Sequence, residues 1–253
     1  MVEQQSPSLT RVLVWLLITL ATPKLLAAEQ LKILKVGVKD NAPPLAVRDR
    51  SGELVGFEVD LAREIGKKLG VTRLELVPML NRDRFPALFA QKVDLVIAQV
   101  TLTSNRARLV DFTLPYYTDR TVVVTKLANY NQSLGLQQLK SIGVLKGSSA
   151  IAALQSVYGG KVVGADSYRK LEAALTLGQV EAIAADYLGL AAWLRANPDY
   201  GMVGQPLAFH SLAIAIPRGL QHQVLFQQTS QAVAELRASG WLQQKAKAWQ
   251  LLE

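Results

Sequence analysis

The sequence predicts an α/β fold made of two similar units, residues ~31–114 and ~121–207. Short apolar or β-branched runs alternate with segments whose apolar residues have helical spacing, which indicates strands and helices in turn. Pro115 interrupts this alternation, and a new β-branched run at residues 121–125 begins the second unit. The pattern therefore favours a mostly parallel sheet in each unit.

The first unit contains alternating strand and helix signals that begin near residue 34. Residues 40–44 must form a loop, because two consecutive prolines cannot continue a strand ladder. A helix is expected from Asp60, which is placed to cap it, to Leu69, and a short helix contains Phe85. The expected strands are residues 34–38, 74–77 and 93–98.

The second unit repeats this logic, and two helices close the chain on either side of Gly240. The expected strands are residues 121–125, 142–145, 161–163, 182–185 and 212–216. One expected helix begins near Ala150. The others cover residues 171–177, 188–195, 224–236 and 242–249.

Composition excludes several functions. The net charge of +8 is scattered, with no basic run longer than Lys67 and Lys68, which indicates a solvated surface rather than a nucleic-acid interface. The absence of cysteine excludes disulfides, thiolate metal sites and cysteine nucleophiles. His210 and His222 are too few for a histidine metal cage, and we expect both to be surface or packing residues.

The N-terminal segment has the layout of a secretory signal peptide covering residues 1–28. Arg11 precedes an apolar run at residues 12–21, which is about half the ~20 residues needed to span a bilayer. Cleavage is expected after Ala27 or Ala28, and an uncleaved anchor or a disordered tail are the alternatives. We therefore expect a mature protein that is soluble and periplasmic.

Polar residues follow several expected strands, at the ends where open α/β sheets bind ligands. These positions are Asp40, residues 99–103, residues 147–149 and Asp186, and Arg106 lies just inside the next helix. Together they provide the groups that a zwitterion needs.

A guanidinium at Arg106 can bind a carboxylate through two parallel hydrogen bonds. Thr101, Ser148 and Ser149 offer further donors, and Asp186 can accept from an ammonium group. Because Arg106 and Asp186 come from different units, a ligand held by both would be clamped between them.

Each of these residues also has a purely structural interpretation. Asp186 and the two serines stand where helix caps are common, and Arg106 can be a surface charge. Glu58 and Asp60 resemble a carboxylate pair, but acids at a helix start are favoured by the helix dipole.

Taken as a set, the motifs have a family resemblance that covers nearly all of residues 31–253. They are residues 34–38, 55–61, 86–88, 93–98, 101–106, 110–117, 142–149, 166–168 and 180–186, with Gly240 near the end. This set resembles the polar amino-acid-binding proteins of ABC transporters, the bacterial extracellular solute-binding protein family 3.

The resemblance implies a two-lobed periplasmic-binding-protein-like fold with two αβ lobes, two hinge strands and a ligand cleft between them. The implied boundaries are lobe 1 at residues 29–115 and 213–253, lobe 2 at residues 121–207, and hinges at residues 116–120 and 208–212. It also implies that Arg106, assisted by Thr101 and by a donor near Ser148 and Ser149, binds the ligand α-carboxylate. Asp186 would bind the α-ammonium.

The chain departs from the family pattern around the ligand side chain. Lys39, Ala42 and Asn81 stand where many members have an acidic residue and aromatic residues, and Gln99 replaces a common glycine. A polar or acidic ligand would suit Lys39, Asn81 and Gln99, and Asp40 lies in the same first loop.

The resulting hypothesis is a monomeric binding protein that passes an amino acid to a membrane permease of an ABC transporter, without cofactor, metal or nucleic acid. One alternative is a dehydratase on the same scaffold that acts on cyclic dienyl acids. It would need a general acid with a raised pKa, and Asp40 and Asp186 are the carboxylates expected in the cleft. The other alternative is a ligand-sensing receptor domain.

Overall fold

The computed structural model describes residues 33–129 and 135–251, so the expected signal peptide lies outside the described residues. The first sheet has the strand order β4-β1-β5-β13-β6. Its strands are β1 (Ile33–Lys39), β4 (Arg73–Met79), β5 (Leu95–Ile97), β6 (Val110–Phe112) and β13 (Ala215–Pro217). A small ribbon pairs β2 (Val47–Arg48) with β3 (Leu54–Val55).

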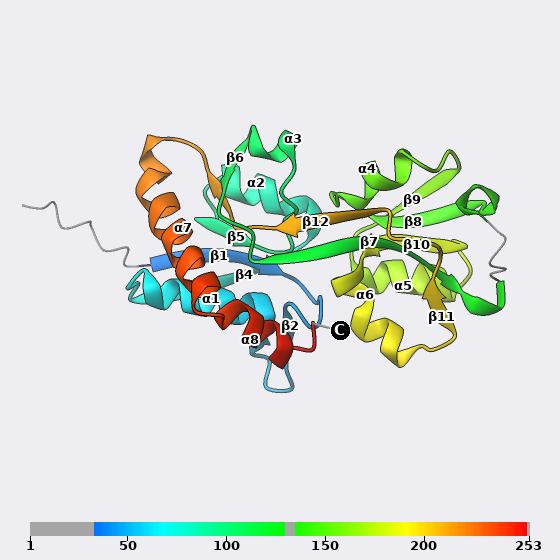
Figure 1. Cartoon of the computed structure of the whole chain (residues 1–253), viewed down its shortest axis with the longest axis horizontal. Coiled ribbons are helices and arrows are strands. Elements are labelled where there is room, and N and C mark those ends of the chain that lie inside the picture. The colour runs from blue at the N-terminus through cyan, green and yellow to red at the C-terminus, as the bar shows by residue number, and fades with distance from the viewer. Residues whose placement is uncertain (1–32, 130–134, 252–253) are drawn as a thin grey trace, which may run out of the picture. The chain divides into compact units, whose positions relative to one another are not determined.

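The second sheet has the order β11-β7-β10-β8-β9, and β12 also pairs with β7. Its strands are β7 (Tyr117–Lys126), β8 (Ser141–Leu145), β9 (Lys161–Ala165), β10 (Ala182–Asp186), β11 (Tyr200–Met202) and β12 (Ala208–Leu212). Figure 1 shows β7 and β12 running together from the elements of the first sheet to those of the second.

The helices follow the strands of each sheet (Figure 1). The α-helices are α1 (Phe57–Lys68), α2 (Arg84–Phe89), α3 (Ser104–Ala107), α4 (Ala150–Gln155), α5 (Tyr168–Thr176), α6 (Tyr187–Ala196), α7 (Gln223–Ala238) and α8 (Trp241–Ala248). Short 3₁₀ helices are η1 (Asn81–Asp83), η2 (Leu127–Asn129), η3 (Leu136–Gln138) and η4 (Leu220–His222). Within the described residues, no helix is both long enough and apolar enough to cross a bilayer.

Each sheet has its own hydrophobic core. Residues of β1, β5 and α1 form one core together with α7 and α8, so the last two helices pack with the first sheet although β7–β12 separate them in sequence. Helices α5 and α6 pack on strands of the second sheet, where Leu171, Ile183 and Leu190 are buried. The chain therefore leaves the first sheet near Tyr117 and returns to it near Leu212.

Several sequence-based expectations differ from the structure. Asp60 does not cap α1, because the helix begins at Phe57 after Gly56, and the Asp60 carboxylate instead accepts hydrogen bonds from Lys245 and Trp249. The strand expected at residues 212–216 is two strands, β12 and β13, that belong to different sheets. In the part of the chain that the structure describes, parallel pairing is limited to β4-β1-β5 and to β10-β8-β9, whereas β7, β11, β12, β13 and β6 pair antiparallel.

Candidate functional site between the two sheets

Strands β1, β5, β8 and β10 end close to one another, and the polar groups that follow them form a continuous cluster. Arg106, on α3, donates from Nη1 to Thr101 O at 3.0 Å and from Nη2 to Gly147 O at 3.2 Å. The hydroxyl groups of Thr101 and Ser149 lie 2.9 Å apart. Because Thr101 follows β5 and Ser149 follows β8, these contacts join the two sheets.

Arg84 strengthens the same junction and was not anticipated from the sequence. It is 2% exposed, and its guanidinium donates to the carbonyl oxygens of Asn81, Ala98, Gln99 and Gly147 at 2.8–3.0 Å. Burial and, to a lesser extent, the nearby charge of Arg106 lower the pKa of Arg84 to about 10. Gly147 O thus accepts from two guanidinium groups, an arrangement that favours an anion at this point.

Asp186 stands at the end of β10, directly before α6. Its side chain makes no capping hydrogen bond, so the interpretation of Asp186 as a simple helix cap is not what the structure shows. Its Oδ1 lies 3.2 Å from His210 Nε2, and neither atom has a well-aligned hydrogen-bond partner among the described residues. A buried carboxylate oxygen of this kind is available to an ammonium donor.

Gln99 links two acidic residues of the site, Glu58 and Asp119. It has a positive φ of 53° and is buried. Its backbone N–H donates to Glu58 Oε1 at 2.6 Å, and its side-chain amide donates to Asp119 Oδ2 and accepts from the Tyr168 hydroxyl, both at 3.2 Å. Glu58 Oε1 also accepts from Tyr116 Oη at 2.6 Å.

Glu58 and Asp119 are buried carboxyl groups with raised pKa values. Burial raises the pKa of Glu58, although its hydrogen bonds from Tyr116 and Gln99 oppose the shift. Burial and the neighbouring charge of Asp186 raise the pKa of Asp119 to about 7. The cluster therefore contains Glu58 and Asp119 in addition to Asp186, which is more carboxyl groups than the sequence led us to expect.

Lys39 is the last residue of β1, and the residue is only 4% exposed. It donates to Asn81 Oδ1 and lies 5.0 Å from the centre of the Tyr168 ring. Burial and the charge of Arg84 lower the pKa of Lys39 to about 7. A small pocket beside Lys39 is lined by Asp40, Asn81, Leu145 and Tyr168, among others.

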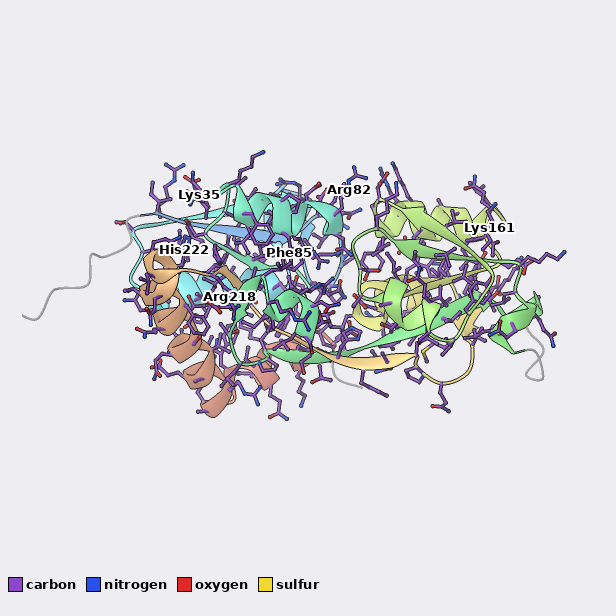
Figure 2. All side chains as sticks on the ribbon, turned by 90° about the horizontal axis from the view of Figure 1, so that it is seen from above. Lys35, Arg82, Phe85, Lys161, Arg218 and His222 are labelled. Atoms are coloured by element: carbon purple, nitrogen blue, oxygen red, sulfur yellow. The ribbon has the colours of Figure 1, made fainter. Side chains whose placement is uncertain are left out.

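The remaining expected site residues lie at the edge of this cluster. Ser148 donates its hydroxyl to Leu145 O at 2.8 Å, so it is Ser149 that contacts Thr101. Asp40 is exposed, and its backbone N–H donates to Met79 O at 3.1 Å. Arg82, labelled in Figure 2, pairs with Asp166 of the second unit and forms an additional bridge between the two sheets.

Five residues of this cluster were not singled out as site residues by the sequence: Glu58, Arg84, Asp119, Tyr168 and His210. Arg84 follows Arg82 and Asp83 in the sequence, so its neighbours do not distinguish it from a surface charge. His210 is 8% exposed in its side chain and faces Asp186, so it is not a surface residue.

Asp119, Asp186 and His210 could also hold a metal ion by distance, since one ligand atom from each lies within 4.8 Å of the others. The Asp119 oxygens, however, already accept hydrogen bonds from the backbone N–H groups of Arg120 and Leu188 and from Gln99. These hydrogen bonds use much of the acceptor capacity of Asp119, whereas Asp186 Oδ1 can still accept from an ammonium group.

The two sheets, the strands that connect them and the oppositely charged groups that meet between them define a two-lobed α/β solute-binding scaffold. The family of bacterial extracellular solute-binding proteins, family 3, matches residues 34–251, and the chain belongs to this family.

Individual relatives support the same assignment. The chain is 26% identical over 227 residues to the ABC transporter arginine-binding protein 1 of Escherichia coli (strain K12), covering 88% of this chain and 91% of that protein. It is 28% identical over 220 residues to the L-cystine-binding protein TcyJ of the same organism, covering 85% and 82%. A solved structure of an ancestral arginine-binding protein bound to arginine matches with a TM-score of 0.78 and 31% identity, covering 87% of this chain and 99% of that chain.

Proposed function

We propose that the chain is the extracytoplasmic substrate-binding component of an amino-acid ABC transporter, and that it holds a polar amino acid between its two sheets. The observation that carries this proposal is the convergence of Arg106 and Thr101 from the first sheet with Ser149 and Asp186 from the second. The family and the names of the relatives agree with it.

The α-carboxylate is assigned to Arg106, Thr101 and Ser149. Arg106 presents a guanidinium that is partly buried, and burial lowers its pKa while the charge of Asp186 opposes that shift. Removing a guanidinium from water is costly unless an anion replaces the lost hydration. A ligand carboxylate at this point would satisfy Arg106 better than the neutral carbonyl oxygens of Thr101 and Gly147.

The α-ammonium is assigned to Asp186. Its carboxylate is 4% exposed, and its Oδ1 has no aligned hydrogen-bond partner among the described residues. The ammonium and carboxylate of one α-amino acid can therefore contact residues of both sheets at once. Such a ligand would favour the state in which the two sheets are held together.

The proposal includes two lobes, residues 29–115 with 213–253 and residues 121–207, and hinges at residues 116–120 and 208–212. What supports it is the pairing of β7 with β12, in which Tyr117–Thr121 lies opposite Ala208–Leu212. Both segments connect one sheet to the other. A change in backbone angles there would move the sheets relative to each other.

Export to the periplasm, delivery to a membrane permease and a monomeric state complete the proposal. The names of curated relatives, which include periplasmic binding proteins, support the location. We further propose that the chain binds without catalysing a reaction. Among the described residues, Asp119 most resembles a general acid, because its pKa is raised to about 7. Three hydrogen-bond donors, however, already contact its carboxyl oxygens.

The test is the variant Arg106→Ala. We expect it to remain folded and to lose about 100-fold or more in affinity, because a charged, hydrogen-bonded contact to the ligand is removed. A thermal-shift screen of the twenty amino acids selects the probe, and isothermal titration calorimetry measures its affinity. Arg108→Ala is the matched control, because Arg108 is exposed on the adjacent turn. Equal affinity in wild type and Arg106→Ala would contradict the assignment of the carboxylate.

A further inference from the structure

The ammonium group of Lys39 is a buried charge whose surroundings contain too little negative charge. It lies at the end of β1 with one hydrogen-bond acceptor, Asn81 Oδ1, and the face of the Tyr168 ring. Within residues 33–129 and 135–251, no carboxylate lies within 4.0 Å of it in an ion pair. A lysine ammonium has three donors, so two of them are not used by these contacts.

Among the described residues, none of the nearby acids forms an ion pair with Lys39. Glu58 accepts from Tyr116 and from the backbone of Gln99, and Asp186 faces His210. Asp40 is exposed. These three carboxylates oppose the lowering of the Lys39 pKa from a distance without forming a direct pair with it.

Arg84 is also a buried cation close to Lys39, but most of its hydrogen-bond donors are already used. Four of its five N–H donors bond to carbonyl oxygens, so it acts as a fixed bridge between η1, β5 and the loop after β8. Its charge also adds to the positive potential around Lys39. Lys39, together with the amide of Asn81, therefore remains available to bind an anion.

We infer that Lys39 and Asn81 form the side-chain subsite of the bound amino acid, and that this subsite selects an amino acid with a side-chain carboxylate, of the aspartate or glutamate class. The inference rests on the proposed amino-acid-binding function and narrows it. A guanidinium or ammonium side chain would meet the buried Lys39 charge and be repelled. This chain would thus differ in selectivity from the arginine-binding proteins to which it is similar.

The uptake of a proton by Lys39 on ligand binding gives a second, independent test of this inference. Because the pKa of Lys39 is about 7 without a bound anion, a large share of this group is neutral at pH 8. A carboxylate placed beside it would raise its pKa, so binding would take up a proton. The groups that face Lys39 and set this balance are Arg84, Glu58, Asp186 and Asp40, with Tyr168 above the ammonium.

The experiment compares L-glutamate with L-glutamine, which has nearly the same shape but no side-chain charge, and adds L-aspartate and L-arginine. Calorimetry on the whole protein is run for wild type, Lys39→Met and Lys35→Met. Lys35→Met is the matched control, because Lys35 lies on the same strand with an exposed side chain, as Figure 2 shows. Melting temperatures establish that each variant is folded.

We expect wild type and Lys35→Met to bind L-glutamate or L-aspartate at least about 30-fold more tightly than the neutral analogue, as for a desolvated charge pair. Lys39→Met should lose most of this preference, because its affinity for L-glutamate should fall much more than its affinity for L-glutamine. Titrations at pH 8 in two buffers of different ionisation enthalpy should show proton uptake with L-glutamate only when Lys39 is present.

Two results would overturn the inference. If L-glutamine or L-arginine binds more tightly than L-glutamate and Arg106→Ala abolishes that binding, the amino-acid-binding function stands and the acidic subsite is wrong. If none of the twenty amino acids binds, the proposed function itself fails, and the subsite fails with it.

Discussion

Asp119 shows how one buried carboxyl group can make stability depend on pH. Its pKa is raised to about 7, mainly by burial and by Asp186, whereas an unfolded aspartate titrates near ~3.9. The folded protein therefore binds this proton more tightly than the unfolded chain does. The resulting stabilisation is complete below pH ~4 and is lost as the pH rises through about 7.

We expect Asp119→Asn to remove this loss. The free energy of unfolding of the variant minus that of wild type should therefore be more positive at pH 8 than at pH 5, by on the order of 2 kcal/mol. The amide of Gln99 can turn to accept from the new Asn nitrogen, and the oxygen that accepts from Arg120 and Leu188 is retained. Urea unfolding at the two pH values measures the difference, and a difference that is the same at both would contradict the role of Asp119.

The loop after β8 brings elements of the two sheets into direct contact. Gly147 has a φ of +73°, and a Cβ at this position would lie 3.1 Å from the Cα of Arg82 in η1. Gly178 has a similar φ of +66° but no atom within 4 Å of such a Cβ. Comparing substitutions at the two glycines therefore distinguishes the effect of backbone strain from the effect of the contact between the sheets.

We expect Gly147→Ala and Gly178→Ala to lose a similar stability, about 1 kcal/mol each, because both place alanine in a left-handed conformation. Only Gly147→Ala should weaken ligand binding, by about 10-fold, since the added methyl group pushes η1 away from the loop. Urea unfolding measures the strain and calorimetry measures the affinity. Equal affinities in the two variants would show that this contact does not control binding.

At the scale of the whole molecule, ligand binding and folding are coupled because the proposed ligand contacts both sheets. A ligand at 100 times its dissociation constant stabilises the folded state by about 2.7 kcal/mol. For a chain of 253 residues this corresponds to a rise in melting temperature of roughly 5–10 °C. Thermal melts with and without the selected amino acid test this, and Arg106→Ala should show little rise at the same concentration.

Local patterns in the sequence indicated which strand ends carry polar groups, but they placed some elements incorrectly. The helix start at Phe57 was missed because Asp60 resembles a cap, although its carboxylate bonds to Lys245 and Trp249 of the distant α8. Residues 212–216 resemble one strand, yet the chain passes from one sheet to the other within them. Both errors arose where a long-range contact overrides a local preference.

The sequence by itself determined the α/β class, the order of the elements and the family, because periodicity and short motifs are properties of neighbouring residues. Only the tertiary structure decided that Glu58 binds Tyr116, 58 residues away, that His210 lies opposite Asp119 on paired strands, and that Lys39 is buried. These facts depend on strand register and on packing between distant segments. Local sequence carries no direct signal for either, so the charge balance of the site becomes visible only in the folded chain.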